Sequence, residues 1–418
     1  MRRIVLILFF IMTSNGFSGE FPLLLRGYLK NSGFYHFSDQ GLFANFSEVH
    51  MDCFKEYGDK GEMELRIIYQ HVLQPLDPFE TLKENSAVDR TVRLGFFEIL
   101  DNFAFINGEF LSFNDIEEWL GYISYSSIYP KEEFFLDRAL LKLYFSKMDL
   151  YIGKQVISWG TGYGFNPTDI WNMKNPLDPN GEKKGIWGLR IEIPIGRVSG
   201  MSMVFKPGKD WLTSSFGFRI KNNLYKYDYS FSMIKDYTPD QRLLGLGEKW
   251  IFGWDWSGEI SEVGFWGEGI CVNALSERNK ELLEFDSVYY QITTGLDYTF
   301  QKGLHVLGVY YYNGIGKKSS DLYSFQDFLN LYTGNMSGFG KHYLMLGMDR
   351  EFFYYYTLSQ YILINLSDES LIYLPQLEYR ITDNLLISIK AQVPAGNKKK
   401  TEFASSYPNF QFVMTGYY

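Results

Sequence analysis

From residue 137 to the C-terminus, apolar and polar side chains alternate almost without interruption. A period of two is the pattern of a β-strand whose two faces meet different surroundings. In residues 249–256, Trp250 and Trp254 fall on one face, whereas Lys249 and Asp255 fall on the other. The same division holds in residues 185–195, 224–234, 286–300 and 385–393. Many of these segments reach about ten residues, the length that a tilted strand needs to cross a membrane.

The apolar faces are unusually rich in aromatic side chains. The sequence contains 36 Phe, 32 Tyr and 9 Trp, which together make up 18% of the residues. A soluble sheet has no need for so many, but an outer-membrane barrel uses them on its lipid-facing surface and in two interfacial girdles. The mean hydropathy of -0.18 agrees with this interpretation, because the two faces of each strand cancel in an average.

The connections between the expected strands alternate between short and long. Short turns are expected at residues 146–149, 196–200, 222–223, 257–261, 301–303 and 382–384. Longer loops are expected at residues 160–184, 206–213, 236–247, 273–285, 316–340 and 396–406, and only the outward connection at 367–370 is short. Short periplasmic turns and longer outer loops are typical of outer-membrane barrels. The last strand then ends in the periplasm at Tyr418 and resembles a bacterial insertion signal.

The N-terminus predicts export. Residues 1–18 read as a signal peptide with a charged Arg2-Arg3 start and an apolar stretch over residues 4–12, which is too short to span a bilayer. Residues 19–418 are expected to form one domain. Early strands are expected at 24–31, 43–54, 63–72 and 91–100, with one short helix that starts at 77–80 and ends before Ser86, and another at 114–121. Because a bacterial barrel needs an even number of strands, we expect a single antiparallel transmembrane β-barrel of 16–18 strands in an outer membrane.

Charge and motifs exclude several classes of function. The formal net charge of -9 argues against a nucleic-acid binder, because phosphate contacts need a basic surface. None of the five histidines has the spacing of a metal site, and no nucleophile elbow or phosphate-binding loop occurs. We therefore expect neither catalysis nor a cofactor. Whether Cys53 and Cys271 pair is left open by the sequence.

One stretch resembles a known family. The sequence has Asp137-Arg138-Ala139, then Gly153-Lys154-Gln155 with Trp159-Gly160, and then Asn166-Pro167-Thr168-Asp169. These residues resemble a large family of porin-like outer-membrane barrels with a G-[RK]-Q-x-x-x-W-G strand and an N-P-x-D loop. More distantly, the stretch is similar to barrels that export or anchor surface polysaccharide. The resemblance implies a porin-like barrel without implying a substrate, and Lys154 stands where Arg is commoner.

The loop after this strand contains the N-P-x-D pattern twice. Proline fixes φ, and Asn or Asp side chains bond to nearby backbone, so each copy predicts a turn. One interpretation is a loop folded into the pore as a constriction, formed by Trp159, Asn166, Asp169, Asn175 and Asp178. A second is a cation site at Asp169 and Asp178. A third is an outer loop that packs on the barrel rim.

Two further groups of residues could shape the lumen. In residues 316–340, Leu322, Phe325, Phe328, Leu329 and Tyr332 recur at helical spacing after Ser319-Ser320, which predicts an amphipathic helix that covers the mouth or a neighbouring loop. Alternation places charged side chains of both signs inside the barrel, as a pore lining or as a salt-bridge network. They are Arg138, Lys142, Arg190, Glu192, Arg219, Lys226, Asp228, Asp255, Asp297, Glu378, Arg380 and Lys390.

The sequence thus favours a channel for small solutes. The competing interpretation is a plugged barrel that binds or assembles surface polysaccharide or a partner protein, and a barrel hydrolase is a third. The expected partners are outer-membrane lipid, the insertion machinery acting on the strand that ends at Tyr418, and small solutes or polysaccharide.

Overall fold

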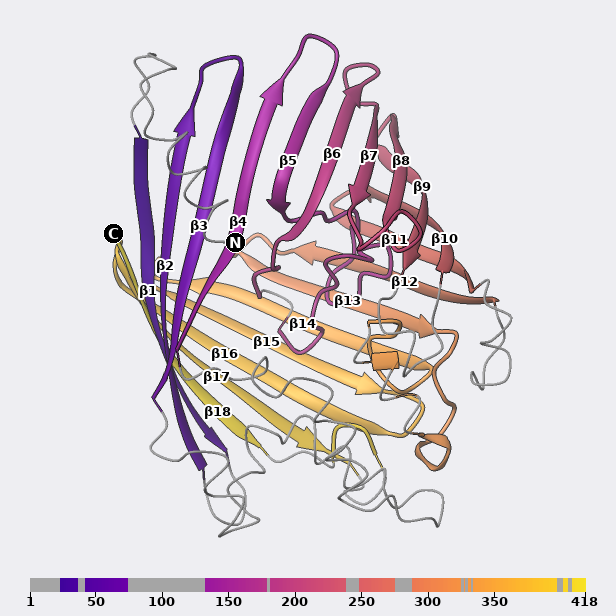
Figure 1. The fold of residues 1–418 in the computed structure, drawn as a ribbon. Helices are drawn as coiled ribbons and strands as arrows, with labels where there is room; N and C mark the ends of the chain where they lie inside the picture. Colours follow the sequence, from indigo (N-terminus) through magenta and orange to yellow (C-terminus); the bar gives the residue numbers. More distant parts are fainter. Residues whose placement is uncertain are drawn as a thin grey trace, which may run out of the picture.

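The computed structural model describes residues 23–36, 42–73, 132–178, 181–237, 248–274, 288–324, 327, 330–331, 334–396, 401–404 and 408–418. Its 18 antiparallel strands form one sheet, and the pairing of β1 with both β2 and β18 closes the sheet into a barrel (Figure 1). The predicted fold, an all-β barrel of 16–18 strands, is confirmed.

The strands follow one another around the barrel in sequence order. The first nine are β1 (Leu23–His36), β2 (Leu42–Glu56), β3 (Gly61–Leu73), β4 (Glu132–Tyr144), β5 (Asp149–Gln155), β6 (Ile186–Pro194), β7 (Gly200–Lys206), β8 (Ser215–Leu224) and β9 (Tyr227–Tyr237). The others are β10 (Glu248–Ile260), β11 (Val263–Ala274), β12 (Val288–Thr299), β13 (Leu304–Asn313), β14 (His342–Phe352), β15 (Tyr356–Asn365), β16 (Ser370–Thr382), β17 (Leu385–Ala395) and β18 (Asn409–Tyr417).

The expected alternation between two faces is present in the register. Asp255 pairs with Ser230 on one side and Glu268 on the other, and directly opposed residues point to the same face of a sheet. All three side chains are buried inside the barrel. Phe252 and Phe231 lie an odd number of residues from Asp255 and Ser230 on their strands, so they point to the outer face, where they are 47% and 62% exposed. The outside is therefore apolar, whereas the inside holds the polar residues.

Short connections gather at one end of the barrel, here called the turn end, and long ones gather at the other, the loop end. At the turn end, the turns expected at 301–303 and 382–384 lie where the sequence predicted them. The turns expected at 222–223 and 257–261 lie farther along the chain than predicted. The reversals occur at 225–226 and 261–262, where Tyr225 and Ser261 each take a φ of 58°. The asparagines at 222–223 continue the strand and pair with residues 229 and 228, so cross-strand pairing outweighs their turn preference.

Strands β1, β2 and β3 confirm three of the four strands expected near the N-terminus. The strand expected at 91–100, the helices expected at 77–80 and 114–121, and the signal peptide all lie outside the described residues. Cys53 in β2 and Cys271 in β11 are free thiols. No helix in the described part of the chain is long and apolar enough to cross a membrane.

An apolar core lies inside the barrel, toward the loop end. Two clusters of buried side chains join the inner wall to the segment between β5 and β6 and to outer-loop residues after β13 and β17. In Figure 1 the magenta segment between β5 and β6 lies within the ring of strands. Loops thus fold into the barrel and pack there as a core packs.

Candidate functional site in the barrel lumen

The loop of residues 156–185, between β5 and β6, has a defined fold of its own. In each N-P-x-D copy the Asp backbone N–H donates to the Asn carbonyl, at 3.1 Å from Asp169 to Asn166 and 3.0 Å from Asp178 to Asn175. Both copies therefore form tight turns. Proline holds φ near the value that such a turn needs at its second position, which explains why the sequence repeats the pattern.

The carboxylate of Asp169 joins the start of this loop to its end. It accepts hydrogen bonds from the backbone N–H groups of Trp159 (2.5 Å) and Gly160 (2.6 Å) and from the Ser158 hydroxyl (2.8 Å). It also pairs with the Lys183 ammonium near the loop's end. The Asp169 side chain is fully buried, so its carboxylate is shielded from water.

Apolar and polar contacts fix the middle of the loop to the wall of β11 and β13–β15. The buried carboxylate of Glu268 accepts hydrogen bonds from the Thr161 backbone N–H and the Thr168 hydroxyl, both at 2.8 Å. Phe165 is 1% exposed and stacks on Tyr311, with ring centroids 4.3 Å apart. These contacts, with one between Tyr163 and Tyr361, hold the loop against the inner surface.

The returning arm of the loop contacts the opposite part of the ring. Asp178 pairs with Lys390 of β17 at 3.3 Å, and Glu182 pairs with Arg66 of β3 at 3.0 Å. Arg66 also binds Asp52 of β2 through two nitrogens, at 2.7 and 3.0 Å. The loop therefore contacts strands on both sides of the lumen.

The other residues expected in a constriction have mainly structural positions. Trp159 is 6% exposed and meets Trp171 edge to face, with both rings over Gly217 of β8. Asn166 is buried and donates to the Gly162 carbonyl at 2.6 Å, and Asn175 accepts from the Leu177 N–H at 3.0 Å. The two carboxylates considered as a cation site have separate cationic partners, and the described residues contain no group of three or more potential metal ligands.

A second network, centred on Glu402, joins the outer loops. Its carboxylate accepts hydrogen bonds from the Tyr343 hydroxyl (2.6 Å), the Asn365 amide (2.7 Å) and the Phe339 backbone N–H (3.1 Å). Burial, together with the nearby carboxylate of Asp368, raises the pKa of Glu402 to about 7, against the lowering effect of the Tyr343 hydrogen bond. Three outer connections thus meet at one titratable group.

The loop after β13 agrees in part with its expected amphipathic helix. Asp327, Asn330 and Leu331 have α-helical backbone, but the segment begins with a short 3-10 turn at Ser320–Leu322, in which Leu322 is 55% exposed instead of packed. Among the described residues of this loop, Ile315, Tyr323, Met336 and Phe339 belong to the inner cluster. The remaining expected contacts of this helix, Phe325, Phe328, Leu329 and Tyr332, lie outside the described residues.

Register places eleven of the twelve expected pore-lining residues on the inner face. Lys226 is the exception: it lies in the exposed turn between β8 and β9, because the strand runs to Leu224 and reverses immediately after it. Several of the eleven have partners: Arg138 with Glu64 and Asp137, Lys142 with Glu62, Arg219 with Asp255, Asp228 with Lys221, Asp297 with His305, Glu378 with Gln376, and Lys390 with Asp178. Arg380 is exposed near the turn end.

Inward-facing charges are divided between two sides of the barrel. On β4–β8 the inward basic side chains are Arg138, Lys142, Arg190, Lys206, Arg219 and Lys221, beside the acidic Asp149 and Glu192. On β9–β15 the inward acidic side chains are Asp228, Asp236, Asp255, Glu259, Glu268, Asp297, Asp349 and Glu351, beside the basic Lys249. A solute in the lumen therefore lies between a mainly basic wall and a mainly acidic wall, and the low-dielectric surroundings strengthen that field.

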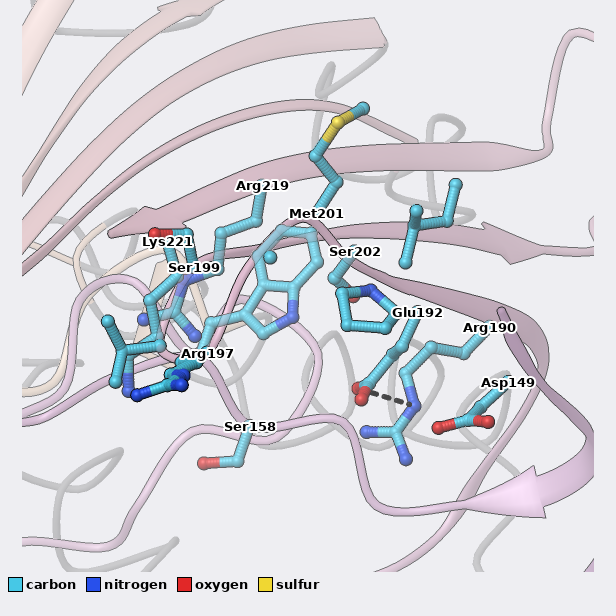
Figure 2. Close-up of a pocket in the computed structure, with 15 residues that line it drawn as sticks. Asp149, Ser158, Arg190, Glu192, Arg197, Ser199, Met201, Ser202, Arg219 and Lys221 are labelled. Atoms are coloured by element: carbon cyan, nitrogen blue, oxygen red, sulfur yellow. Dashed lines mark ion pairs between the residues drawn. The ribbon is translucent and has the colours of Figure 1, made fainter. Parts of the chain in front are cut away.

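A cavity of about 410 Å³ opens on the basic wall, between the start of loop 156–185 and the turn end of the barrel. Its sides come from β5–β8, from the turn at 195–199 and from two loop residues, Ser158 and Trp159. Figure 2 shows Arg197, Arg219 and Lys221 toward one end of the cavity, and Arg190, Glu192 and Asp149 toward the other. The Arg190 guanidinium lies 4.1 Å from the Tyr151 ring centroid and 3.5 Å from Glu192.

Sequence reasoning identified Arg190, Glu192 and Arg219 but not the other charged groups of this cavity. Lys221 follows Arg219 by two residues, so the same alternation could have found it. Asp149 and Arg197 lie at the edge of a turn and within one, where alternation gives no information on direction. Glu268, which lies outside this cavity and binds loop 156–185, was also missed, because it belongs to β11, a strand whose glycines weaken the apolar pattern.

Comparisons with known proteins agree on the fold alone. No protein-family model matches the sequence, and no curated protein sequence matches it. The chain is similar in structure to Pseudomonas aeruginosa OccK9 (OpdG), with a TM-score of 0.56, 8% identity and coverage of 96% of this chain and 99% of that one. It is also similar to Acinetobacter baumannii OccAB2 (TM-score 0.56, 7% identity, 94% and 97% covered) and to P. aeruginosa OccK11 (OpdR) (0.54, 9%, 94% and 95%).

Proposed function

We propose that this protein is a bacterial outer-membrane channel through which small solutes pass. The observation that carries the proposal is a closed barrel of 18 strands with an apolar outer face and charged side chains on its inner face. Barrels of this size leave an aqueous lumen unless loops fill it. The outward-facing Phe410, Phe412 and Met414 of β18, each more than 40% exposed, support insertion through the C-terminal strand.

Loop 156–185 acts as the constriction of this channel. It folds inward, packs on the wall of β11 and β13–β15, and reaches β3 and β17 through ion pairs with Arg66 and Lys390. A loop with that many contacts keeps one shape, so it sets a fixed minimum width. The ion pair between the exposed Glu182 and the mostly buried Arg66 contributes charge at this level.

Single-channel conductance in planar bilayers tests the proposal, with the wild type compared with a variant lacking residues 162–183. We expect steady open-channel steps from the wild type and larger steps from the deletion. A matched deletion within the outer loop 207–214, which lies at the rim, should leave the step size unchanged. Equal conductance of wild type and 162–183 deletion would refute the constriction.

A plugged barrel that binds surface polysaccharide or a partner protein is the second candidate, and one observation favours it. The two apolar clusters fill space inside the loop end of the barrel with buried residues such as Tyr323, Phe339 and Phe403. If these clusters seal the lumen, the wild type is silent and only the deletion conducts. That outcome would assign the protein to binding or assembly.

A further inference from the structure

Some of the charged side chains that line the cavity on the basic wall already have partners within the protein. Arg219 donates to both carboxylate oxygens of Asp255 at 3.0 Å and to the Ser230 hydroxyl at 2.8 Å, so its charge is engaged. Arg190 lies against Tyr151 and close to Glu192. The cavity therefore carries less net positive charge than its lining residues suggest.

One end of the cavity keeps a positive charge available. Arg197 is exposed in the turn at 195–199 and forms no ion pair with any residue that the structure describes. Lys221 is about half exposed and lies 4.0 Å from Asp228, at the limit of an ion pair. In Figure 2 these two cationic residues lie toward the same end of the cavity.

The other end keeps a negative charge available. Asp149, at the start of β5, has no cationic partner within the described part of the chain. Glu192 pairs only loosely with Arg190, at 3.5 Å, and its side chain is 41% exposed. Figure 2 places Asp149 and Glu192 together on the side opposite Arg197.

We propose that this cavity binds zwitterionic small solutes of the amino-acid type during their passage. The carboxylate of the solute lies at Arg197 and Lys221, and its ammonium group lies at Asp149 and Glu192. This inference rests on the proposed channel function and names the solute class that the channel favours. A volume of about 410 Å³ accommodates an amino acid or a short peptide and lies within the usual range for ligand sites.

The two ends act together only on a solute that carries both charges. An anion is attracted to the Arg197 end and repelled by the Asp149 end. A cation is attracted to the Asp149 end and repelled by the Arg197 end. Because the groups are partly exposed, the two charged groups at each end together change the dissociation constant of the solute by about fivefold. Such a site is weak enough to release its solute, which a channel requires.

The test is binding of three molecules of matched chain length to the full protein in detergent micelles, measured by ligand-observed NMR. The probes are 4-aminobutyrate, butyrate and butylammonium. We expect 4-aminobutyrate to bind about fivefold more tightly than either single-charge analogue. Longer ω-amino acids extend the comparison and locate the spacing that fits best.

Two variants and two matched controls sharpen the test. Asp149→Asn should reduce the preference for 4-aminobutyrate over butyrate, and Arg197→Gln should reduce its preference over butylammonium. Asp383→Asn and Lys302→Gln change exposed charges on other turns at the same end of the barrel, so both preferences should persist. Arg197→Lys keeps the charge and should keep most of the binding.

The outcomes separate this inference from the channel itself. Butyrate binding as tightly as 4-aminobutyrate, with no effect of Asp149→Asn, would identify an anion site and overturn the proposal. Absence of binding by all three probes would overturn it as well. Preferential 4-aminobutyrate binding by a protein that is silent in bilayers would uphold the site and refute the channel. A protein that conducts but does not prefer 4-aminobutyrate would uphold the channel and refute the site.

Discussion

Replacing Asp169 with Asn should release the inward-folded loop, because one carboxylate joins both of its ends. The side chain is fully buried and accepts hydrogen bonds from Ser158, Trp159 and Gly160 as well as from Lys183. Asparagine keeps one acceptor oxygen but turns an NH₂ group toward donors. The ammonium of Lys183, whose side chain is 14% exposed, would then lack its counter-charge.

The magnitude follows from burial. Removing one partner of a buried ion pair costs about 3–5 kcal/mol, because it leaves an uncompensated charge. If this cost acts on the loop alone, the population with a released loop rises by roughly a hundredfold to several thousandfold. The barrel itself should remain intact, because its strands pair without Asp169.

Asp178→Asn supplies the matched control, because Asp178 has the same place in the second N-P-x-D copy. Its partner is Lys390, and the two side chains are 46% and 30% exposed, so the pair contributes about 1 kcal/mol or less. The assay is the rate of tryptic cleavage after Lys174 in the folded protein, read together with single-channel conductance.

We expect much faster cleavage and larger, noisier conductance for Asp169→Asn, with at most a few-fold change in cleavage for Asp178→Asn. The reasoning would be refuted if the two variants behaved alike. It would also be refuted if Asp169→Asn were cleaved as slowly as the wild type, since the loop would then be held by its wall contacts alone.

Three further predictions concern charge and backbone conformation. The pKa of Glu402, about 7, lies above its ordinary value of 4.5, so its stabilising contribution is present below pH 4.5 and is lost as the pH rises through 7. Glu402→Gln should therefore flatten the fall in unfolding free energy between about pH 5 and pH 8, as measured by urea titration; an unchanged slope would contradict this. Arg219→Met leaves Asp255 buried without its cation and should lower the unfolding free energy by about 3–5 kcal/mol, most of which the double variant Arg219→Met/Asp255→Leu should restore. Gly164 has a φ of 77°, and a Cβ there would lie 2.8 Å from the Met345 sulfur. Gly164→Ala should therefore destabilise the folded loop by about 1–3 kcal/mol and speed its tryptic cleavage, whereas cleavage at the wild-type rate would contradict this.

Much of the fold could be predicted because alternation is a local signal. Each residue of a strand is assigned to a face by its neighbours two places away, so the faces of β10, β12 and β17 follow from the sequence alone. Turn positions were harder. Tyr225 and Ser261 occupy left-handed conformations that residue preference would give to glycine or asparagine, and only pairing with the adjacent strand explains them.

The site was predicted less completely, for a physical reason. Its contacts join residues far apart in sequence, such as Glu182 with Arg66 and Asp178 with Lys390. The repeated N-P-x-D pattern indicated a stiff loop, because turn chemistry is local, but not which strands that loop would contact. Arg197 was missed because a residue within a turn has no face that alternation can assign.

The two halves of the lumen follow different physical rules, and this division locates selectivity. Toward the loop end, inward residues such as Phe165 and Tyr311 pack as a core, so substitutions there should act through cavity formation and change the position of the loop. Toward the turn end, Arg197 and Asp149 lie on an open cavity wall and contribute little to packing. Substitutions at those two positions should therefore change which solutes bind without altering the folded state. A solute that crosses the barrel meets a width set by packing first and a charge pattern second, so the two properties should respond to separate sets of variants.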